Sequence, residues 1–192
     1  MHPGDHSIDN AQLAALARRL NRPIALVGLM GVGKSTVGRK LAALLDIPFI
    51  DADDEIERAA QRSIPEIFAE YGEPAFRDGE RRVISRLIED GHNAPKVIAT
   101  GGGAFCQETT RELLKSQTVT VWIDSDVPTL VARTAKRENR PLLKGGDPAE
   151  ILSRLRDERA PHYAQAHIHV FSDNGPHLHT ALAILKELDA CL

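Results

Sequence analysis

The sequence predicts one α/β domain in which a parallel β-sheet is covered by helices on both faces. Short apolar stretches that are typical of strands alternate along the chain with stretches of helical periodicity, and this alternation favours a parallel sheet. A glycine-rich motif at residues 28–36 separates the first strand from the following helix. With 192 residues, of which 42% are apolar, the chain is long enough for one such domain and too short for two of ordinary size.

The five predicted strands are short and apolar, at residues 24–27, 47–50, 97–100, 119–123 and 168–171. Helices are predicted between them and at both ends of the chain, at residues 13–20, 37–45, 63–70, 73–90, 108–116, 128–135, 147–161 and 178–188. The first helix is expected to be capped by Asp9 or Asn10, and a capping box at Ser63 and Glu66 starts the third. Residues 137–146 are charged, end on glycines and lack apolar periodicity, which predicts a mobile loop.

Charge and cysteine content restrict the class of protein. A net charge of -3, from 24 basic and 27 acidic residues, provides no polycationic surface for nucleic acid or an acidic membrane. Cys106 and Cys191 show no metal-binding or redox spacing, which favours a reducing compartment. No apolar run approaches ~18 residues and no signal-like leader opens the chain, so we expect no membrane segment and a cytoplasmic location.

The motif at Gly28–Thr36 matches G-x-x-x-x-G-K-[ST] and predicts a phosphate-binding loop. Glycines let successive backbone N–H groups face one centre, and the following helix adds its positive end. Lys34 would neutralise the β- and γ-phosphate oxygens, and Ser35 would hold Mg²⁺. The alternative, a chance glycine-rich turn, is disfavoured by the flanking strand and helix. Because the chain has no N-K-x-D guanine-reading run, ATP is favoured over GTP.

Two carboxylates follow the second predicted strand, at the sheet edge where the phosphate loop also ends. Because ligands gather at the carboxyl ends of parallel strands, Asp51 and Asp53 are expected beside the bound nucleotide. Asp53 could accept the proton of an acceptor hydroxyl, and Asp51 suits the water shell of Mg²⁺. The alternative is that both residues only cap the helix that follows.

Three arginines and a triple glycine complete the candidate site. Gly101–Gly103 follow the third strand, so their backbone can approach the γ-phosphate or the acceptor closely. Arg77 and Arg159 could each grip a substrate carboxylate, or could be surface residues, Arg77 then forming a solvated pair with Glu80. Arg140 could meet charge that develops on the transferred phosphoryl group, or could remain a solvated cation.

Together these segments resemble the shikimate kinase family over about residues 22–190. The resemblance rests on six motifs in order: Gly28–Thr36, Asp51-Ala-Asp53, Phe76-Arg77 with Glu80, Thr100–Gly103, Arg140–Leu143 and Arg159-Ala-Pro161. It implies transfer of the γ-phosphate of ATP to the 3-hydroxyl of shikimate, with Mg²⁺, on the path to chorismate and aromatic amino acids. It also implies a monomer whose partner is a small molecule rather than nucleic acid or a membrane.

The resemblance implies the three-layer P-loop kinase fold, a five-stranded parallel sheet with helices on both faces, a helical substrate-binding insert and a mobile lid. Within the single domain at residues 1–192, the expected division is an N-terminal extension at 1–21, a nucleotide-binding core at 22–50, 93–136 and 148–192, the insert at 51–92, and the lid at 137–147. The extension, with its helix, goes beyond the compact start that is usual in the family, and packing or a partner contact are both open as its role.

The resemblance also implies a role for each candidate residue. The catalytic residues would be Lys34, Asp53 and Arg140. The nucleotide would be bound by Gly31, Val32, Gly33, Lys34, Ser35, Thr36, Arg133, Arg140 and Pro176, with Arg133 and Pro176 at the adenine. Shikimate would be bound by Asp53, Arg77, Gly102, Gly103 and Arg159, and Mg²⁺ by Ser35 and Asp51.

Two other functions stay open at this point. One is a kinase for a different polyol acid such as gluconate, and the other is a regulator that binds ATP without transferring phosphate. The histidines near the end of the chain, at positions 162, 167, 169, 177 and 179, could in principle bind a metal. No cysteine or carboxylate completes a set with ligand spacing, which disfavours that reading.

Overall fold

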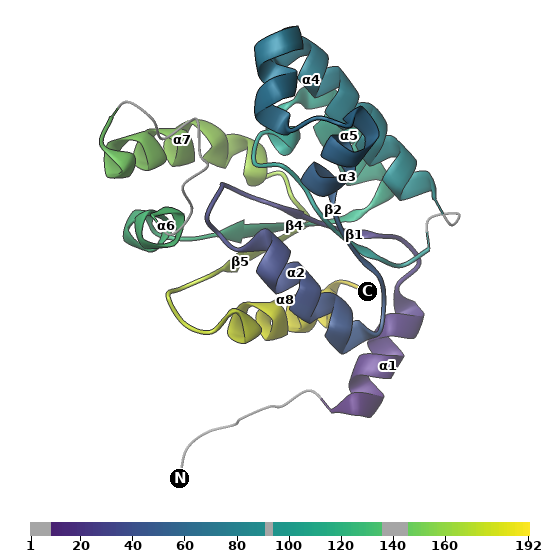
Figure 1. Ribbon diagram of the computed structural model, residues 1–192. Coiled ribbons are helices and arrows are strands. Elements are labelled where there is room, and N and C mark those ends of the chain that lie inside the picture. The colour runs from purple at the N-terminus through teal and green to yellow at the C-terminus, as the bar shows by residue number, and fades with distance from the viewer. Residues whose placement is uncertain (1–8, 91–93, 136–145) are drawn as a thin grey trace.

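The computed structural model describes residues 9–90, 94–135 and 146–192, and its strands form one parallel sheet (Figure 1). The five strands have the order β2-β3-β1-β4-β5, and every neighbouring pair is parallel. Their bounds are β1 Ile24–Val27, β2 Phe49–Asp51, β3 Val97–Ala99, β4 Val119–Asp124 and β5 Ile168–Phe171. The predicted fold class is confirmed.

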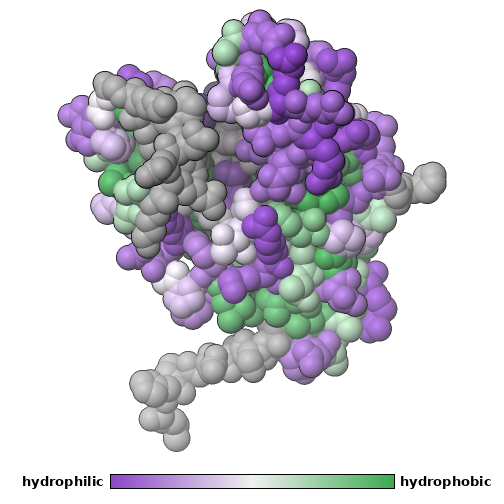
Figure 2. Space-filling model, in the orientation of Figure 1, coloured by the Kyte–Doolittle hydropathy of each residue, from purple (hydrophilic) through white to green (hydrophobic). Residues whose placement is uncertain are grey.

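Helices cover both faces of this sheet, as predicted. Their bounds are α1 Asn10–Arg19, α2 Lys34–Leu45, α3 Ala52–Ala60, α4 Ile64–Glu89, α5 Glu108–Gln117, α6 Val127–Thr134, α7 Pro148–Tyr163 and α8 His177–Cys191, with a 3₁₀ turn, η1, at Ala104–Cys106. Figure 1 shows α2 and α8 on one side of the sheet and α4 and α5 on the other. Hydrophilic side chains dominate the visible surface of α3 and α4 in the upper part of Figure 2.

The core centres on β1, whose four residues are completely buried. Ile24 of β1 is in register with Val97 of β3 on one side and Val119 of β4 on the other. A central parallel strand covered on both faces must be apolar throughout, which explains why this stretch has no polar alternation. Burial of β1 fixes the start of the following loop at the carboxyl edge of the sheet.

The helix in the N-terminal extension packs on the body of the domain. Asp9 caps α1 through a capping box with Gln12. Leu13 and Leu16 are buried in the main core, and Arg19 forms an ion pair of 2.6 Å with Asp189 of α8. These contacts give α1 a packing role.

Two features of the helices differ from the prediction. No separate helix was predicted at α3, which starts directly after β2 with the Asp51 side chain as its cap. Helix α2 starts at Lys34 instead of residue 37. The two helices predicted at 63–70 and 73–90 are confirmed, because α4 is interrupted at Gly72, whose φ of 76° and ψ of 173° are not helical.

Part of the sequence prediction lies outside the described residues. The expected lid at 137–147 and its Arg140 fall almost wholly in residues 136–145, which the structure does not describe. Within the described ranges, every helix is too short or too polar to cross a bilayer.

Candidate active site

The glycine-rich loop at residues 28–33 carries the chain from β1 into α2. Gly33 directly precedes α2 with a φ of 96°, a left-handed conformation that favours glycine, and no side chain caps the helix there. The Lys34 ammonium folds back over the loop and donates to the carbonyl of Gly28 at 2.7 Å and of Leu29 at 3.0 Å. The uncapped N–H groups at the start of α2, together with Lys34, form a site for an anion.

Oxygen ligands lie directly beside this loop. Ser35 Oγ donates to Asp51 Oδ2 at 2.6 Å, and Asp51 Oδ1 accepts from the backbone N–H of Asp53 at 3.2 Å. Asp51 therefore does cap α3, as the alternative reading held, but its second oxygen faces Ser35. A hydroxyl and a carboxylate suit a hard cation, so these two residues fit Mg²⁺.

Asp53 lies in the first turn of α3 and faces the triple glycine. A Cβ placed on Gly101 would lie 2.9 Å from Asp53 Oδ1 and 2.8 Å from Glu80 Oε1, so both carboxylates point toward the same glycine. Burial, reinforced by the neighbouring Asp51 carboxylate, raises the pKa of Asp53. A carboxylate with a raised pKa holds a proton more readily than an exposed one does.

Arg77 and Glu80 do not form the solvated surface pair that was the alternative in the sequence analysis. Arg77 forms ion pairs with Glu80 at 2.7 Å and with Glu73 at 3.2 Å, and the Glu80 side chain is only 1% exposed. Burial raises the pKa of Glu80, and the Arg77 guanidinium opposes that rise. Because both partners belong to α4, the guanidinium is held in place by its own helix.

The triple glycine allows Arg77 and Arg159 to approach the backbone. A Cβ on Gly103 would lie 2.3 Å from Arg77 Nη2, so any larger residue there would displace the guanidinium. A Cβ on Gly102 would lie 3.7 Å from Arg159 Nη1, and the Gly102 carbonyl accepts a hydrogen bond from the Tyr163 hydroxyl. Arg159 and Tyr163 are one turn apart on α7. This helix therefore contributes both a guanidinium and a hydrogen-bonding hydroxyl to the triple glycine.

Arg133 joins α6 to the phosphate-binding region. Its guanidinium donates to the Val32 carbonyl at 3.1 Å and to Ser172 Oγ at 3.3 Å. Val32 itself is buried, and Pro176 is exposed just before α8, so neither residue lines the central cavity. Of the two residues expected at the adenine, the structure therefore brings only Arg133 to the cavity.

One cavity of about 540 Å³ connects these groups. Its lining residues come from the loop, β2, α3, α4, the triple glycine, α6, α7 and α8. Some of these residues are more than 100 positions apart in the sequence. Its polar lining includes Lys34, Ser35, Thr36, Asp51, Asp53, Arg77, Glu80, Arg133, Arg159 and His177. Phe68 and Phe76 form an apolar wall, with ring centroids 4.4 Å apart.

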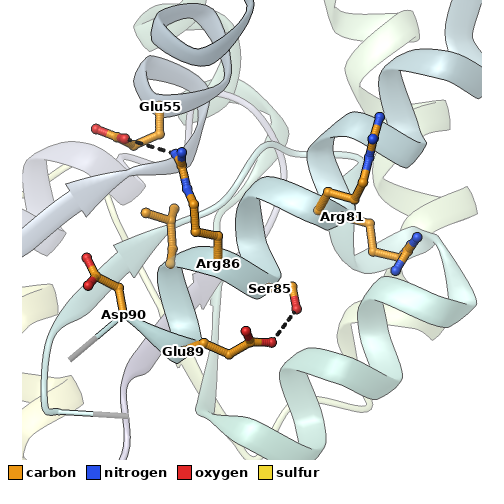
Figure 3. A pocket seen from close by; sticks show the side chains of 8 residues that line it. Glu55, Arg81, Ser85, Arg86, Glu89 and Asp90 are labelled. Atoms are coloured by element: carbon orange, nitrogen blue, oxygen red, sulfur yellow. Dashed lines mark hydrogen bonds and ion pairs between the residues drawn. The ribbon is translucent and has the colours of Figure 1, made fainter. Parts of the chain in front are cut away.

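A larger hollow of about 720 Å³ lies along α4, away from these residues (Figure 3). Its guanidinium groups each face a carboxylate: Arg86 pairs with Glu55 at 3.5 Å, and Arg81 and Arg82 pair with Asp78 at 3.0 Å and 3.1 Å. Figure 3 also shows Ser85 bonded to Glu89 within α4. This hollow lacks the loop and the rim residues, so the 540 Å³ cavity is the candidate active site.

Three residues of the site escaped the sequence analysis or were undervalued by it. Glu80 was read mainly as half of a surface pair, because its burial depends on packing that the i,i+3 spacing with Arg77 does not show. Tyr163 follows Arg159 by four residues, a spacing that could have placed it on the same face of α7. His177 belongs to no motif, and no sequence signal points to it.

Three of the other C-terminal histidines have partners elsewhere in the structure. His167 Nδ1 lies 3.0 Å from the Thr120 backbone nitrogen, which donates to it, and the ring of His169 stacks on Trp122 at 3.9 Å. His162 Nδ1 lies 3.4 Å from Arg111 Nη1. Among the described residues, no group of three or more metal-binding side chains comes together at these histidines or elsewhere.

A parallel sheet with a phosphate-binding loop, and a cavity that joins this loop to carboxylates and arginines, defines a P-loop phosphotransferase for a small acidic molecule. The family model of shikimate kinase matches residues 30–189. The chain belongs to the shikimate kinase family, so it is a kinase that uses ATP with Mg²⁺, as expected.

Individual relatives agree with this family. The chain is 59% identical to a shikimate kinase of Novosphingobium aromaticivorans, over 96% of both chains. The structure resembles that of shikimate kinase from Acinetobacter baumannii in complex with shikimate, with a TM-score of 0.83, 38% identity, and coverage of 95% of this chain and 98% of that chain. A gluconokinase from Sinorhizobium meliloti shares the fold, with a TM-score of 0.61 at 18% identity over 90% and 94% of the two chains.

Proposed function

We propose that this chain transfers the γ-phosphate of ATP to the 3-hydroxyl of shikimate, giving shikimate 3-phosphate and ADP. One observation carries the proposal: the phosphate-binding loop, Asp53 and two arginines line the same cavity. Shikimate has ring hydroxyls and one carboxylate, so it requires a hydrogen-bond acceptor near the γ-phosphate and a guanidinium at the other end. Asp53 supplies the acceptor, and Arg77 with Arg159 supplies the guanidinium groups.

In this mechanism the backbone of Gly31–Thr36 and the Lys34 ammonium bind the phosphates, after Lys34 leaves the loop carbonyls that it contacts in the present structure. Ser35 and Asp51 would hold Mg²⁺, which neutralises charge on the β- and γ-phosphate oxygens when bound. Arg133 would approach the nucleotide from α6, and its hydrogen bond to the Val32 carbonyl of the phosphate-binding loop supports this role. In our proposal Pro176, which is exposed outside the cavity, would have to reach the adenine from the loop before α8.

Asp53 orients the acceptor hydroxyl and receives its proton. As the hydroxyl oxygen forms a bond to the γ-phosphorus, the bond between that phosphorus and the bridging oxygen of ADP breaks, and ADP leaves with the electron pair. Burial and Asp51 raise the pKa of Asp53, which makes this carboxylate a better proton acceptor than an exposed aspartate. The Lys34 ammonium stabilises the negative charge of the phosphoryl group as this group passes from the bridging oxygen of ADP to the hydroxyl oxygen.

Substrate recognition belongs to α4, α7 and the triple glycine. Arg77 and Arg159 bind the carboxylate of shikimate, while Gly102 and Gly103 allow the ring to approach the backbone. We assign Arg140 to the lid, where its guanidinium would meet the phosphates. Replacement of Arg140 by alanine should lower kcat without changing the melting temperature, and full activity of this variant would remove Arg140 from the mechanism.

A coupled assay of ADP release tests the proposal. We expect turnover with shikimate to exceed turnover with gluconate, because the chain is 59% identical to a shikimate kinase and only 18% identical to the gluconokinase that shares its fold. Preferred turnover of gluconate would assign the chain to another polyol acid. No ADP release above background with any hydroxy acid would favour a nucleotide-binding regulator.

We also infer a cytoplasmic monomer. The family membership and the low net charge of -3 support a small-molecule enzyme that needs neither nucleic acid nor a membrane. Every residue assigned above lies on this one chain, so the site needs no second copy. Sedimentation velocity at micromolar concentration should give a mass near 21.0 kDa, and a stable dimer would contradict the inference.

A further inference from the structure

His177, the first residue of α8, has its ring against the phosphate-binding loop. A Cβ on Gly33 would lie 2.9 Å from His177 Cε1 and 3.1 Å from Nδ1, so the imidazole covers the glycine that precedes Lys34. His177 also lines the cavity that Lys34, Ser35 and Thr36 share. The ring therefore borders the place where the nucleotide phosphates meet the start of α2.

One ring nitrogen lacks a protein partner. His177 Nδ1 is buried from solvent and has no hydrogen-bond partner among the described residues. Buried polar atoms are rarely left without one, so an exception that borders a binding cavity calls for an explanation outside the protein's own hydrogen bonds. The arrangement leaves a hydrogen-bonding group beside the loop that the protein itself does not use.

Burial and nearby cations favour the neutral form of the His177 ring. Burial, together with the nearby cations Arg133 and Lys40, lowers the pKa of His177. A neutral imidazole carries one N–H, and the ligand atoms nearest this loop are phosphate and ribose oxygens, which accept hydrogen bonds. A neutral ring that donates through Nδ1 therefore matches a bound nucleotide.

We propose that His177 contacts the nucleotide directly, with Nδ1–H donating a hydrogen bond to an oxygen of bound ATP or ADP. This proposal rests on the proposed function only in that a nucleotide occupies the loop. It adds the first residue of α8 to the nucleotide site, near Arg133 of α6. It does not depend on the identity of the phosphoryl acceptor.

Titration calorimetry of ADP with Mg²⁺, in the absence of shikimate, tests the contact. His177→Phe keeps a ring against Gly33 but has no donor, and we expect its Kd for ADP to rise about tenfold. His177→Asn places an amide N–H close to the position of Nδ1, and we expect its Kd to stay within about threefold of the original value. His179→Phe, an exposed position on the same helix, should leave Kd unchanged.

Two results would overturn the proposal. If His177→Phe binds ADP as tightly as the original protein, no hydrogen bond from Nδ1 contributes. If His177→Asn loses as much affinity as His177→Phe at equal melting temperature, an N–H group at this position does not restore binding, so no hydrogen bond from Nδ1 holds the nucleotide. Should His177→Phe fail to fold, His177→Ala replaces it as the donor-free variant, with the same expectation.

A second ligand identifies the acceptor atom. If the variants lose affinity for both ADP and inorganic pyrophosphate, Nδ1 contacts a phosphate, and if they lose affinity only for ADP, it contacts the ribose. Either pattern supports the proposal. Because ADP binding is measured without an acceptor substrate, the result stays separate from the shikimate assay and can stand if that assay fails.

Discussion

The two halves of the cavity hold their charges in different ways. In the phosphate-binding half, the binding groups are backbone N–H groups, and Lys34 contacts carbonyls of its own loop. In the half that we assign to the acid substrate, charged side chains face one another: Arg77 pairs with Glu73 and Glu80, and Asp53 lies beside Asp51 and Glu80. The first half depends on local chain conformation, whereas the second depends on packing between separate elements.

The largest effect should come from the phosphate-binding half. Lys34→Ala removes a positive charge where the transition state gathers negative charge, and we expect kcat/KM to fall by about 10³-fold, measured by coupled ADP release. Lys186→Ala, an exposed lysine on α8, is the control and should be fully active. Near-normal turnover of Lys34→Ala would mean that the backbone N–H groups of the loop stabilise the transition state without the lysine.

Asp53→Asn tests the junction of the two halves. We expect kcat to fall by about 10²-fold, because the amide cannot accept the proton of the hydroxyl. Asp54→Asn, at an exposed neighbouring position, should keep its activity. Equal activity of both variants would remove Asp53 from the chemistry.

The same variant has a predicted stability signature. Burial and Asp51 raise the pKa of Asp53, so the folded state binds its proton more tightly than the unfolded chain does. The free energy of unfolding must then decrease as pH rises from about 4 through the raised pKa. Asp53→Asn should melt at a higher temperature than the original protein at pH 7 and at the same temperature below about pH 4.

Arg77→Lys tests the acid-binding half with the charge on Glu80 still balanced. A lysine cannot make two parallel hydrogen bonds to a carboxylate, so we expect the KM for shikimate to rise about tenfold while the KM for ATP stays unchanged. Arg82→Lys, an arginine that is 71% exposed on the same helix, serves as the control. An unchanged KM for shikimate would separate Arg77 from substrate binding.

The smallest effect is expected at Tyr163. Tyr163→Phe preserves the packing of a side chain that is 2% exposed but leaves the Gly102 carbonyl without its donor. We expect the KM for shikimate to rise about threefold with little change in the KM for ATP, because one hydrogen bond contributes about 1 kcal/mol. Tyr71→Phe, at a tyrosine that is 55% exposed, controls for the loss of a hydroxyl. Equal KM changes for both substrates would indicate a general structural role.

The sequence predicted the phosphate-binding half better than the acid-binding half, and the reason is physical. The loop from Gly28 to Thr36 is contiguous and lies between one strand and one helix, so its conformation follows from local residues. The position of the Arg77 guanidinium depends on the burial of Glu80 and on the close approach of Gly103, which lies outside α4. No local pattern contains that information.

The missed elements have similar causes. Helix α3 is short and has only two buried residues, Ala52 and Ile56, among nine, so it contains too few apolar residues for a helical pattern to stand out in the sequence. The start of α2 at Lys34 was placed too late because Lys34, Ser35 and Thr36 are not apolar. The position of His177 depends on how α8 approaches the loop, which the sequence of α8 does not specify.

The pairing of Arg77 with two glutamates of its own helix has a consequence for inhibitors. Glu73 and Glu80 restrain the guanidinium at 3.2 Å and 2.7 Å without help from any ligand. The Arg77 side chain would therefore lose little conformational entropy when a compound with a planar carboxylate binds to it. Such a compound should select this end of the cavity even in enzyme molecules that carry no nucleotide.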